Sequence, residues 1–188
     1  MNTLKGAAGA AQEVRRRLDK PLTLIGMMGS GKTRIGRTLA GALALPFFDS
    51  DDEIEKAAGM TVADIFDRFG EPYFRDGEQR VIGRLLKTGP CVLATGGGAV
   101  MRPETASIIW MDTVSIWVKA DMSVMLERTS RSDRRPLLRN GDPEEILRGM
   151  MEKRYPVYEK ADIVVESHNG PVEAILNQTL NKLLDFLN

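Results

Sequence analysis

The chain has 188 residues, 43% of them hydrophobic and 28% charged, so it is long enough for one well-buried α/β domain and short for two. Its formal net charge of zero excludes a strong overall attraction to nucleic acid or to an anionic membrane. The single cysteine, Cys91, excludes an internal disulfide, no Cys/His spacing fits a zinc site, and we expect a reducing cytoplasm.

Residues 1–20 predict an N-terminal extension ahead of a single domain over residues 21–188. The extension contains no apolar run long enough for a signal peptide or a membrane span. Val14 and Leu18 lie at helical spacing around the run Arg15–Arg17, which favours a short, frayed and solvated helix over a contact patch. We therefore expect neither export nor membrane anchoring.

The segment Gly26–Thr33 has the pattern of a phosphate-binding loop: glycine, four residues, glycine, lysine, and then serine or threonine. The short apolar run Leu22–Ile25 before it is typical of a buried strand. After it, Ile35, Leu39 and Leu43 recur at helical spacing. This strand, loop and helix context favours a nucleotide site over a chance glycine-rich turn.

The residue types in this loop point to a nucleoside triphosphate with Mg²⁺ as the ligand. Backbone N–H groups of Gly29, Ser30 and Gly31 would face the phosphates, helped by the positive end of the following helix. Lys32 would reach the β- and γ-phosphates, and the Thr33 hydroxyl would bind Mg²⁺.

An acidic group follows the second expected strand, Phe47–Phe48. In a doubly wound sheet, ligands gather outside the carboxyl ends of the strands, which is where these acids would fall. Asp49 and Asp51 are two residues apart and would face the same way if the strand continued. The alternative is a helix N-cap at Asp51 or Asp52, and both interpretations can hold if Asp49 binds metal-bound water.

Residues 61–87 are mostly helical by their apolar pattern, and Gly70 and Pro72 interrupt the pattern. Within this segment, Arg75 lies three residues before Glu78. At that spacing an arginine and a glutamate usually form a surface ion pair that stabilises the helix by roughly a few tenths of a kcal/mol. Seen alone, this pattern favours a structural role for Arg75 over a functional one.

The third expected strand, residues 91–95, ends in three glycines, Gly96, Gly97 and Gly98. One glycine normally suffices for a turn, and three cost chain entropy, so the run indicates close approach of another group to the backbone. A flexible turn is the alternative. A helix beginning at Pro103 and a fourth strand over Val114–Val118 should follow.

A basic segment follows the next helix, which begins near Asp121. This turn-rich stretch contains only one acidic residue, at 133, and five arginines, at 128, 131, 134, 135 and 139. Arg135 adjoins the stiff apolar run Pro136–Leu138, a combination typical of a lid over about 129–141 that closes on phosphate and excludes water. A solvated loop is the alternative for any one of these arginines.

The remaining chain predicts a helix from about Pro143 that ends in the segment Arg154–Tyr158, a fifth strand over Asp162–Glu166, and a closing helix over Val172–Leu187. Arg154 would face the site if the end of its helix lay beside the lid. We expect the single histidine, His168, to be an uninvolved turn residue.

Together these motifs resemble the shikimate kinase family from about residue 21 onward. The phosphate loop alone indicates only a nucleotide. The specific signal is the ordered set of Asp49-Ser50-Asp51, Phe74-Arg75, Gly96-Gly97-Gly98, Arg135-Pro136-Leu137-Leu138 and Arg154-Tyr155-Pro156-Val157-Tyr158. The resemblance implies a three-layer α/β kinase fold with a five-stranded parallel sheet in the order 2-3-1-4-5, an acceptor-binding region at about 50–87, and a mobile lid.

The resemblance also implies an activity, which is transfer of the γ-phosphoryl group of MgATP to the 3-hydroxyl of shikimate on the route to chorismate and the aromatic amino acids. ATP and shikimate are then the partners, Mg²⁺ is the cofactor, and a monomer is expected. On this basis Asp49 lies near magnesium through water, and Asp51 holds the reacting hydroxyl. Arg75 and Arg154 grip the shikimate carboxylate.

The resemblance assigns the remaining site residues as well. The backbone of Gly96, Gly97 and Gly98 meets the shikimate hydroxyls, and two aromatic rings, Phe66 and Phe74, line the pocket. Arg135 reaches the transferring phosphate, and Arg128 stacks near adenine. Two guanidinium groups opposite a carboxylate suit a small acid that carries several hydroxyls.

Three other functions compete with this interpretation. A gluconate kinase would share the phosphate loop but would not need Arg75, the three glycines and Arg154 together. A nucleoside monophosphate kinase would need base-recognition contacts that the sequence does not reveal. A nucleotide switch would need neither Asp51 nor the arginines on the acceptor side.

Overall fold

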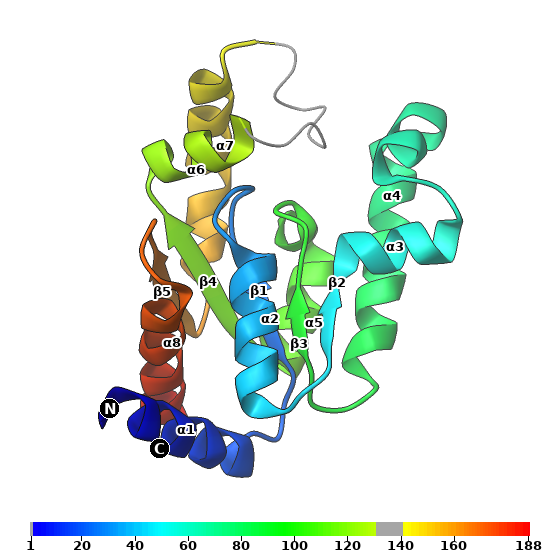
Figure 1. Ribbon diagram of the computed structural model, residues 1–188. Helices are drawn as coiled ribbons and strands as arrows, with labels where there is room; N and C mark the ends of the chain where they lie inside the picture. Colours follow the sequence, from blue (N-terminus) through cyan, green and yellow to red (C-terminus); the bar gives the residue numbers. More distant parts are fainter. Residues whose placement is uncertain (1, 131–140) are drawn as a thin grey trace.

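The computed structural model describes residues 2–130 and 141–188, with side chains from residue 6 onward, and has a parallel sheet at its centre (Figure 1). The strands are β1 Leu22–Ile25, β2 Phe47–Asp49, β3 Val92–Ala94, β4 Val114–Ala120 and β5 Ile163–Ser167. All pairings are parallel, and the spatial order is β2-β3-β1-β4-β5, which confirms the order expected from the family resemblance.

Eight α-helices and one short 3₁₀-helix belong to the described part of the chain. They are α1 Asn2–Arg17, α2 Lys32–Leu43, α3 Ser50–Ala58, α4 Val62–Leu86, η1 Ala99–Met101, α5 Pro103–Asp112, α6 Met122–Ser130, α7 Pro143–Tyr158 and α8 Val172–Phe186. No helix of the described residues is long and apolar enough to cross a membrane.

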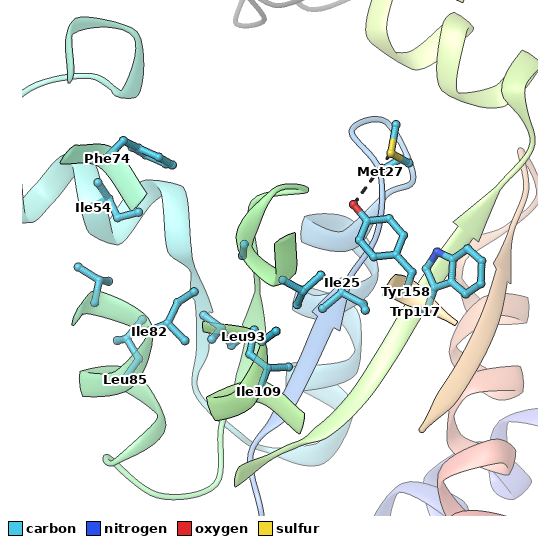
Figure 2. Packing of buried hydrophobic residues seen from close by; sticks show 14 of the residues in the cluster. Ile25, Met27, Ile54, Phe74, Ile82, Leu85, Leu93, Ile109, Trp117 and Tyr158 are labelled. Carbon is cyan, nitrogen blue, oxygen red and sulfur yellow. Dashed lines mark hydrogen bonds between the residues drawn. The ribbon is translucent and has the colours of Figure 1, made fainter. Parts of the chain in front are cut away.

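Two hydrophobic clusters lie on opposite faces of the sheet, because successive strand residues alternate between the faces. Leu24 packs on the face covered by α1, α2 and α8. Its neighbour Ile25 belongs to the same cluster as Leu93 and Trp117 (Figure 2), and residues of α4, α5 and α7 cover this face. This arrangement is the three-layer architecture expected from the sequence.

The N-terminal segment forms a longer and better packed helix than a frayed extension would. Ala11, Val14 and Leu18 are buried in the cluster that contains α8, whereas Arg15 and Arg16 are exposed. The side chain of Arg17 also donates a hydrogen bond to Asn188, at the other end of the chain. Arg15 and Arg16 are therefore solvated, whereas Arg17 is half-buried, and α1 is attached to the domain by its apolar face.

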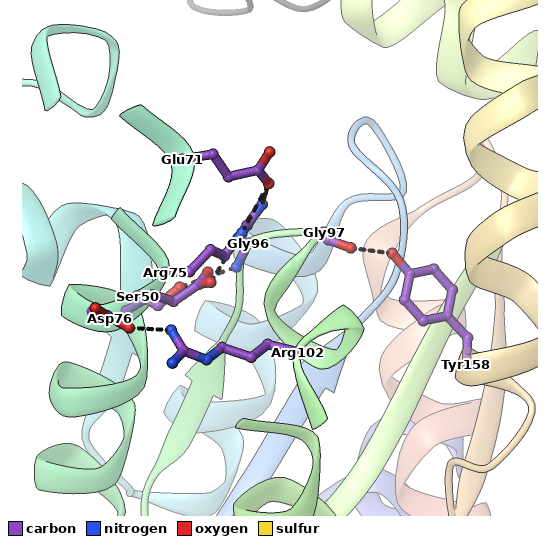
Figure 3. Close-up of polar contacts among 9 residues, drawn as sticks. Ser50, Glu71, Arg75, Asp76, Gly96, Gly97, Arg102 and Tyr158 are labelled. Atoms are coloured by element: carbon purple, nitrogen blue, oxygen red, sulfur yellow. Dashed lines mark hydrogen bonds and ion pairs between the residues drawn. The ribbon is translucent and has the colours of Figure 1, made fainter. Parts of the chain in front are cut away.

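The helix α4 is divided by a break at Gly70, where the sequence interrupts the apolar pattern. Gly70 has φ 80° and ψ 172°, which are not helical values, and Pro72 follows in the first turn of the second half. The first half starts with a reciprocal capping pair between Thr61 and Asp64. Arg75 belongs to the second half, and Figure 3 shows its side chain beside Gly96, which follows β3.

Candidate active site

The functional residues lie at the carboxyl edge of the sheet, where the loops after β1, β2 and β3 meet. In Figure 1 the phosphate loop between β1 and α2 and the glycine loop after β3 lie side by side at this edge, between α3–α4 and α6–α7. The strand order places β3 directly between β1 and β2. Groups from three separate parts of the sequence are thus brought to one place, as expected at the switch point of a doubly wound sheet.

The phosphate loop has the backbone geometry that its glycines require. Gly29 and Gly31 have φ values of 76° and 98°, in the left-handed region that favours glycine. A Cβ atom at Gly26 would lie 2.4 Å from the carbonyl oxygen of Val118. Gly31 is the N-cap of α2, so the N-terminus of that helix opens directly onto the loop.

The side chain of Lys32 folds over this loop. Its Nζ donates hydrogen bonds of 2.9 Å to the carbonyl oxygens of Gly26 and Met27. Ser30 is fully buried within the loop. The ammonium group therefore lies on the inner side of the loop, where it carries positive charge beside an N-terminal helix dipole.

The two residues expected to bind magnesium contact each other. Thr33 Oγ1 donates a 2.8 Å hydrogen bond to Asp49 Oδ2. A hydroxyl and a carboxylate oxygen at this spacing suit Mg²⁺, which takes few protein ligands and completes its shell with water and phosphate oxygens. Among the described residues, no group of three acidic, histidine or cysteine side chains is placed so that it could hold a metal ion.

Asp49, not Asp51 or Asp52, is the N-cap of α3, and this corrects the capping expectation. Strand β2 ends at Asp49 and the helix begins at Ser50, so the strand does not continue to Asp51. Asp49 Oδ1 accepts a 3.2 Å hydrogen bond from the backbone N–H of Asp51. The helical turn, instead of strand alternation, places the Asp51 carboxylate near Asp49.

Asp51 has the properties of a proton acceptor. Its Oδ1 is buried and has no hydrogen-bond partner among the described residues. Burial raises the pKa of Asp51 to about 6, helped by the charge of Asp49 and opposed by Lys32 and Arg75. An unpartnered oxygen of this kind is poised to accept a hydrogen bond from a ligand.

The three glycines allow three side chains to approach the backbone, which agrees with the close approach expected from the sequence. A Cβ at Gly96 would lie 3.0 Å from Asp51 Oδ1, one at Gly97 would lie 3.0 Å from Arg154 Nη1, and one at Gly98 would lie 2.3 Å from Arg75 Nη2. The structure therefore brings Asp51, Arg75 and Arg154 together around one loop, although they come from three different helices.

Tyr158, which the sequence motif contained but to which no separate role was assigned, supports this loop on the Arg154 side. Its hydroxyl donates a hydrogen bond to the carbonyl oxygen of Gly97 (Figure 3). Burial raises the pKa of Tyr158 to about 12, although a hydrogen bond with Arg154 opposes that shift. The ring is fully buried beside Trp117, so the end of α7 is anchored where Arg154 emerges.

The pair formed by Arg75 and Glu78 is not the surface ion pair expected from its spacing. Glu78 is completely buried, and its Oε2 accepts a 2.6 Å hydrogen bond from Arg75 Nη1. Burial raises the pKa of Glu78 to about 7, against the opposing charge of Arg75. The second half of α4 turns this face inward against the glycine loop, and sequence spacing alone cannot show which face is buried.

The two phenylalanines assigned to the pocket lie beside Arg75. The rings of Phe66 and Phe74 are 4.7 Å apart between centroids, and the Arg75 guanidinium carbon lies 5.1 Å from the centre of the Phe74 ring. Phe74 is almost completely buried and Phe66 partly so. Together they form an apolar wall next to a cation, which suits a ring-shaped acid.

Arg128 connects the end of α6 to the phosphate loop. Its Nη1 donates to the carbonyl oxygens of Gly29 and Ser30 at 3.1 and 3.2 Å and to Ser167 Oγ at 3.1 Å, and its Nη2 donates to the carbonyl oxygen of His168 at 2.8 Å. Burial lowers the pKa of Arg128, and the neighbouring charge of Arg34 lowers it further. The imidazole of His168 accepts a hydrogen bond from the N–H of Gly170 within its own turn.

The expected lid lies mostly outside the described residues. Arg135, with the run Pro136–Leu138 and the arginines at 131, 134 and 139, falls in the part of the chain that the structure does not describe. Residues 129 and 130 form the end of α6, and Gly141 precedes the N-cap Asp142 of α7. The described site therefore consists of the phosphate loop, the α3–α4 region, the glycine loop and the end of α7.

Comparison with known proteins identifies a family for this chain. The model of the family described as shikimate kinase matches residues 28–184 of this chain. The shikimate kinase of Rhodopseudomonas palustris is 50% identical over 169 residues, which cover 90% of this chain and 83% of the relative. That of Paramagnetospirillum magneticum is 46% identical over 186 residues, which cover 95% of each chain.

A solved structure agrees with these sequence relatives. The shikimate kinase from Acinetobacter baumannii in complex with shikimate has a TM-score of 0.86 to this structure at 35% sequence identity. The similarity covers 90% of this chain and 95% of that chain. The likeness therefore extends over almost the whole of both folds.

Proposed function

The chain belongs to the shikimate kinase family, and from that premise we propose that it transfers the γ-phosphoryl group of ATP to the 3-hydroxyl of shikimate, giving ADP and shikimate 3-phosphate. The observation that carries the proposal is the meeting of Asp51, Arg75 and Arg154 around the glycine loop, beside the phosphate loop. Two guanidinium groups and one carboxylate complement an acid with several hydroxyls. A switch that only binds nucleotide has no use for them.

In the proposed reaction, Asp51 is the proton acceptor. The 3-oxygen of shikimate attacks the γ-phosphorus, the bond from phosphorus to the bridging oxygen of ADP breaks, and the hydroxyl proton passes to a carboxylate oxygen of Asp51. A pKa of about 6 leaves Asp51 mostly ionised at pH 7 and still basic enough to take the proton. Its unpartnered oxygen lies against Gly96, whose loop we assign to the acceptor hydroxyls.

Positively charged groups of the chain would balance the charge that develops on the phosphoryl group. Lys32, whose ammonium group contacts two carbonyl oxygens of the loop, would bind phosphate oxygens there, and the N-terminus of α2 would stabilise the same negative charge. Arg135 remains a predicted contact of the transferring phosphate. Arg128 remains a predicted stacking partner of adenine. Its hydrogen bonds to the phosphate loop support this prediction, because they fix the plane of the guanidinium group.

Thr33 and Asp49 are the residues that would hold Mg²⁺, Thr33 directly and Asp49 through water. Bound there, the ion would neutralise and orient the phosphates. The apolar wall of Phe66 and Phe74 would exclude water from the ring of the acceptor. We further predict a cytoplasmic monomer, with ATP and shikimate as its ligands.

The direct test measures ADP production with MgATP and either no acceptor, shikimate or gluconate. We expect strong stimulation by shikimate alone, and kcat of Asp51→Asn at least about a hundredfold lower with ATP binding retained, because the lost group acts on the acceptor. Stimulation by gluconate instead would contradict the substrate. Unchanged turnover of Asp51→Asn would remove Asp51 from the reaction.

A further inference from the structure

Arg75 carries a second carboxylate partner that the proposed function leaves unused. Glu71 Oε1 accepts hydrogen bonds from Arg75 Nε at 3.2 Å and from Arg75 Nη2 at 3.1 Å (Figure 3). On the other side of the guanidinium, Nη1 donates to Glu78. One positive charge therefore faces two carboxylates before any acceptor binds.

The two partners of Arg75 differ in how easily they can leave. The side chain of Glu78 is 0% exposed, and that of Arg75 is 19% exposed. The side chain of Glu71, in contrast, is 63% exposed. An exposed ion pair contributes little because water screens it, whereas a buried pair cannot separate without leaving charge in an apolar environment. Glu78 is the fixed partner and Glu71 the replaceable one.

Glu71 occupies the edge of the guanidinium that an incoming carboxylate needs. The Nε and Nη2 groups form the side of the arginine fork that binds carboxylates with two parallel hydrogen bonds. The guanidinium also lies close to Gly98, where a Cβ atom would be only 2.3 Å from Nη2 and 2.8 Å from Cζ. An acceptor acid that uses this edge must replace Glu71.

The break in α4 gives Glu71 somewhere to go. Gly70 has non-helical backbone angles, so Glu71 lies in the first turn of the second half of the helix, four residues before Arg75. Negative charge is stabilised in the first turn of a helix. The released carboxylate can therefore turn into solvent by a rotamer change and remain favourably placed.

We propose that Glu71 competes with the acceptor for Arg75: it occupies the Nε and Nη2 edge of Arg75 until the carboxylate of the acceptor takes its place. This inference rests on the proposed function, because it assumes that Arg75 binds the acceptor's carboxylate. The exchange leaves the number of charge-assisted hydrogen bonds on Arg75 unchanged for an acid. For an uncharged analogue it leaves Glu71 in place, so such a molecule gains nothing from the arginine.

The test compares wild type with Glu71→Gln, which keeps the size of the side chain and removes its charge. We expect the Kd for shikimate, measured by titration calorimetry without nucleotide, to fall about twofold to fivefold, the range of one exposed ion pair. The KM for the methyl ester of shikimate should stay the same, and so should kcat and the KM for ATP. A Kd that is unchanged or higher in Glu71→Gln would overturn the proposal, because Glu71 would then orient Arg75 instead of competing for it.

A matched control is Glu144→Gln, which removes a carboxylate from an exposed pair at the same spacing, Glu144 with Arg148 in α7. It should leave the shikimate Kd unchanged, and an equal tightening in this variant would mean that net charge alone explains the effect. Arg75→Ala separates the two proposals. Wild-type shikimate affinity in Arg75→Ala would refute the carboxylate site itself, whereas weak binding there with no tightening in Glu71→Gln would refute only the role of Glu71.

Discussion

Replacing the buried carboxylate of Glu78 by an amide should change how the stability of this enzyme depends on pH. Glu78→Gln keeps the shape of the side chain and an oxygen acceptor for Arg75 Nη1, but it cannot ionise. In the wild type, Glu78 is completely buried and burial raises its pKa from 4.5 to about 7. The difference, at about 1.4 kcal/mol for each pH unit, amounts to about 3 kcal/mol.

The sign follows from which state binds the proton. Between pH 4.5 and about pH 7 the unfolded chain has released the Glu78 proton while the folded protein retains it, so raising the pH favours unfolding. The contribution of Glu78 to stability is fully present below pH 4.5 and is lost as the pH rises through about 7. Glu78→Gln lacks this loss, so its unfolding free energy relative to wild type should rise by about 3 kcal/mol between pH 4.5 and pH 8.

Urea unfolding of both proteins at pH 4.5, 6, 7 and 8, followed by circular dichroism, measures this difference. Glu71→Gln is the control because it removes the exposed carboxylate from the same arginine, where we expect an effect of less than about 1 kcal/mol. A constant difference between Glu78→Gln and wild type at every pH would refute the reasoning. It would mean that Arg75 fully compensates the burial of Glu78.

Further expectations concern the acceptor and the metal. Arg75→Ala should raise the KM for shikimate about tenfold to a hundredfold, because a charge-assisted pair is lost, and should leave the KM for ATP within about threefold. Steady-state kinetics with each substrate varied in turn measures both values. A rise in the KM for ATP instead would contradict the assignment. Asp49→Asn keeps a good N-cap for α3 but weakens the hydrogen bond with Thr33. It should therefore raise the Mg²⁺ concentration for half-maximal activity severalfold without lowering the melting temperature. An unchanged Mg²⁺ titration would contradict the assignment of Asp49 to the magnesium site.

The local elements of this protein could be predicted from the sequence. The phosphate loop, the strand before it and the helix after it depend on contacts between near neighbours, and β1 spans the predicted Leu22–Ile25. The interruption at Gly70 is likewise a backbone property of one residue. The strand order, by contrast, came from resemblance to a family, because periodicity does not specify which strands pair.

The arrangement of the site was decided by tertiary structure. The spacing of Arg75 and Glu78 is the same in a surface pair and in a buried one, and only the packing of α4 against the glycine loop makes Glu78 a buried partner with a raised pKa. Arg154 reaches Gly97 because β3 lies between β1 and β2 and α7 crosses the same edge. Residue types and short-range spacing determine local conformation, whereas burial and the meeting of distant charges arise only when the layers pack.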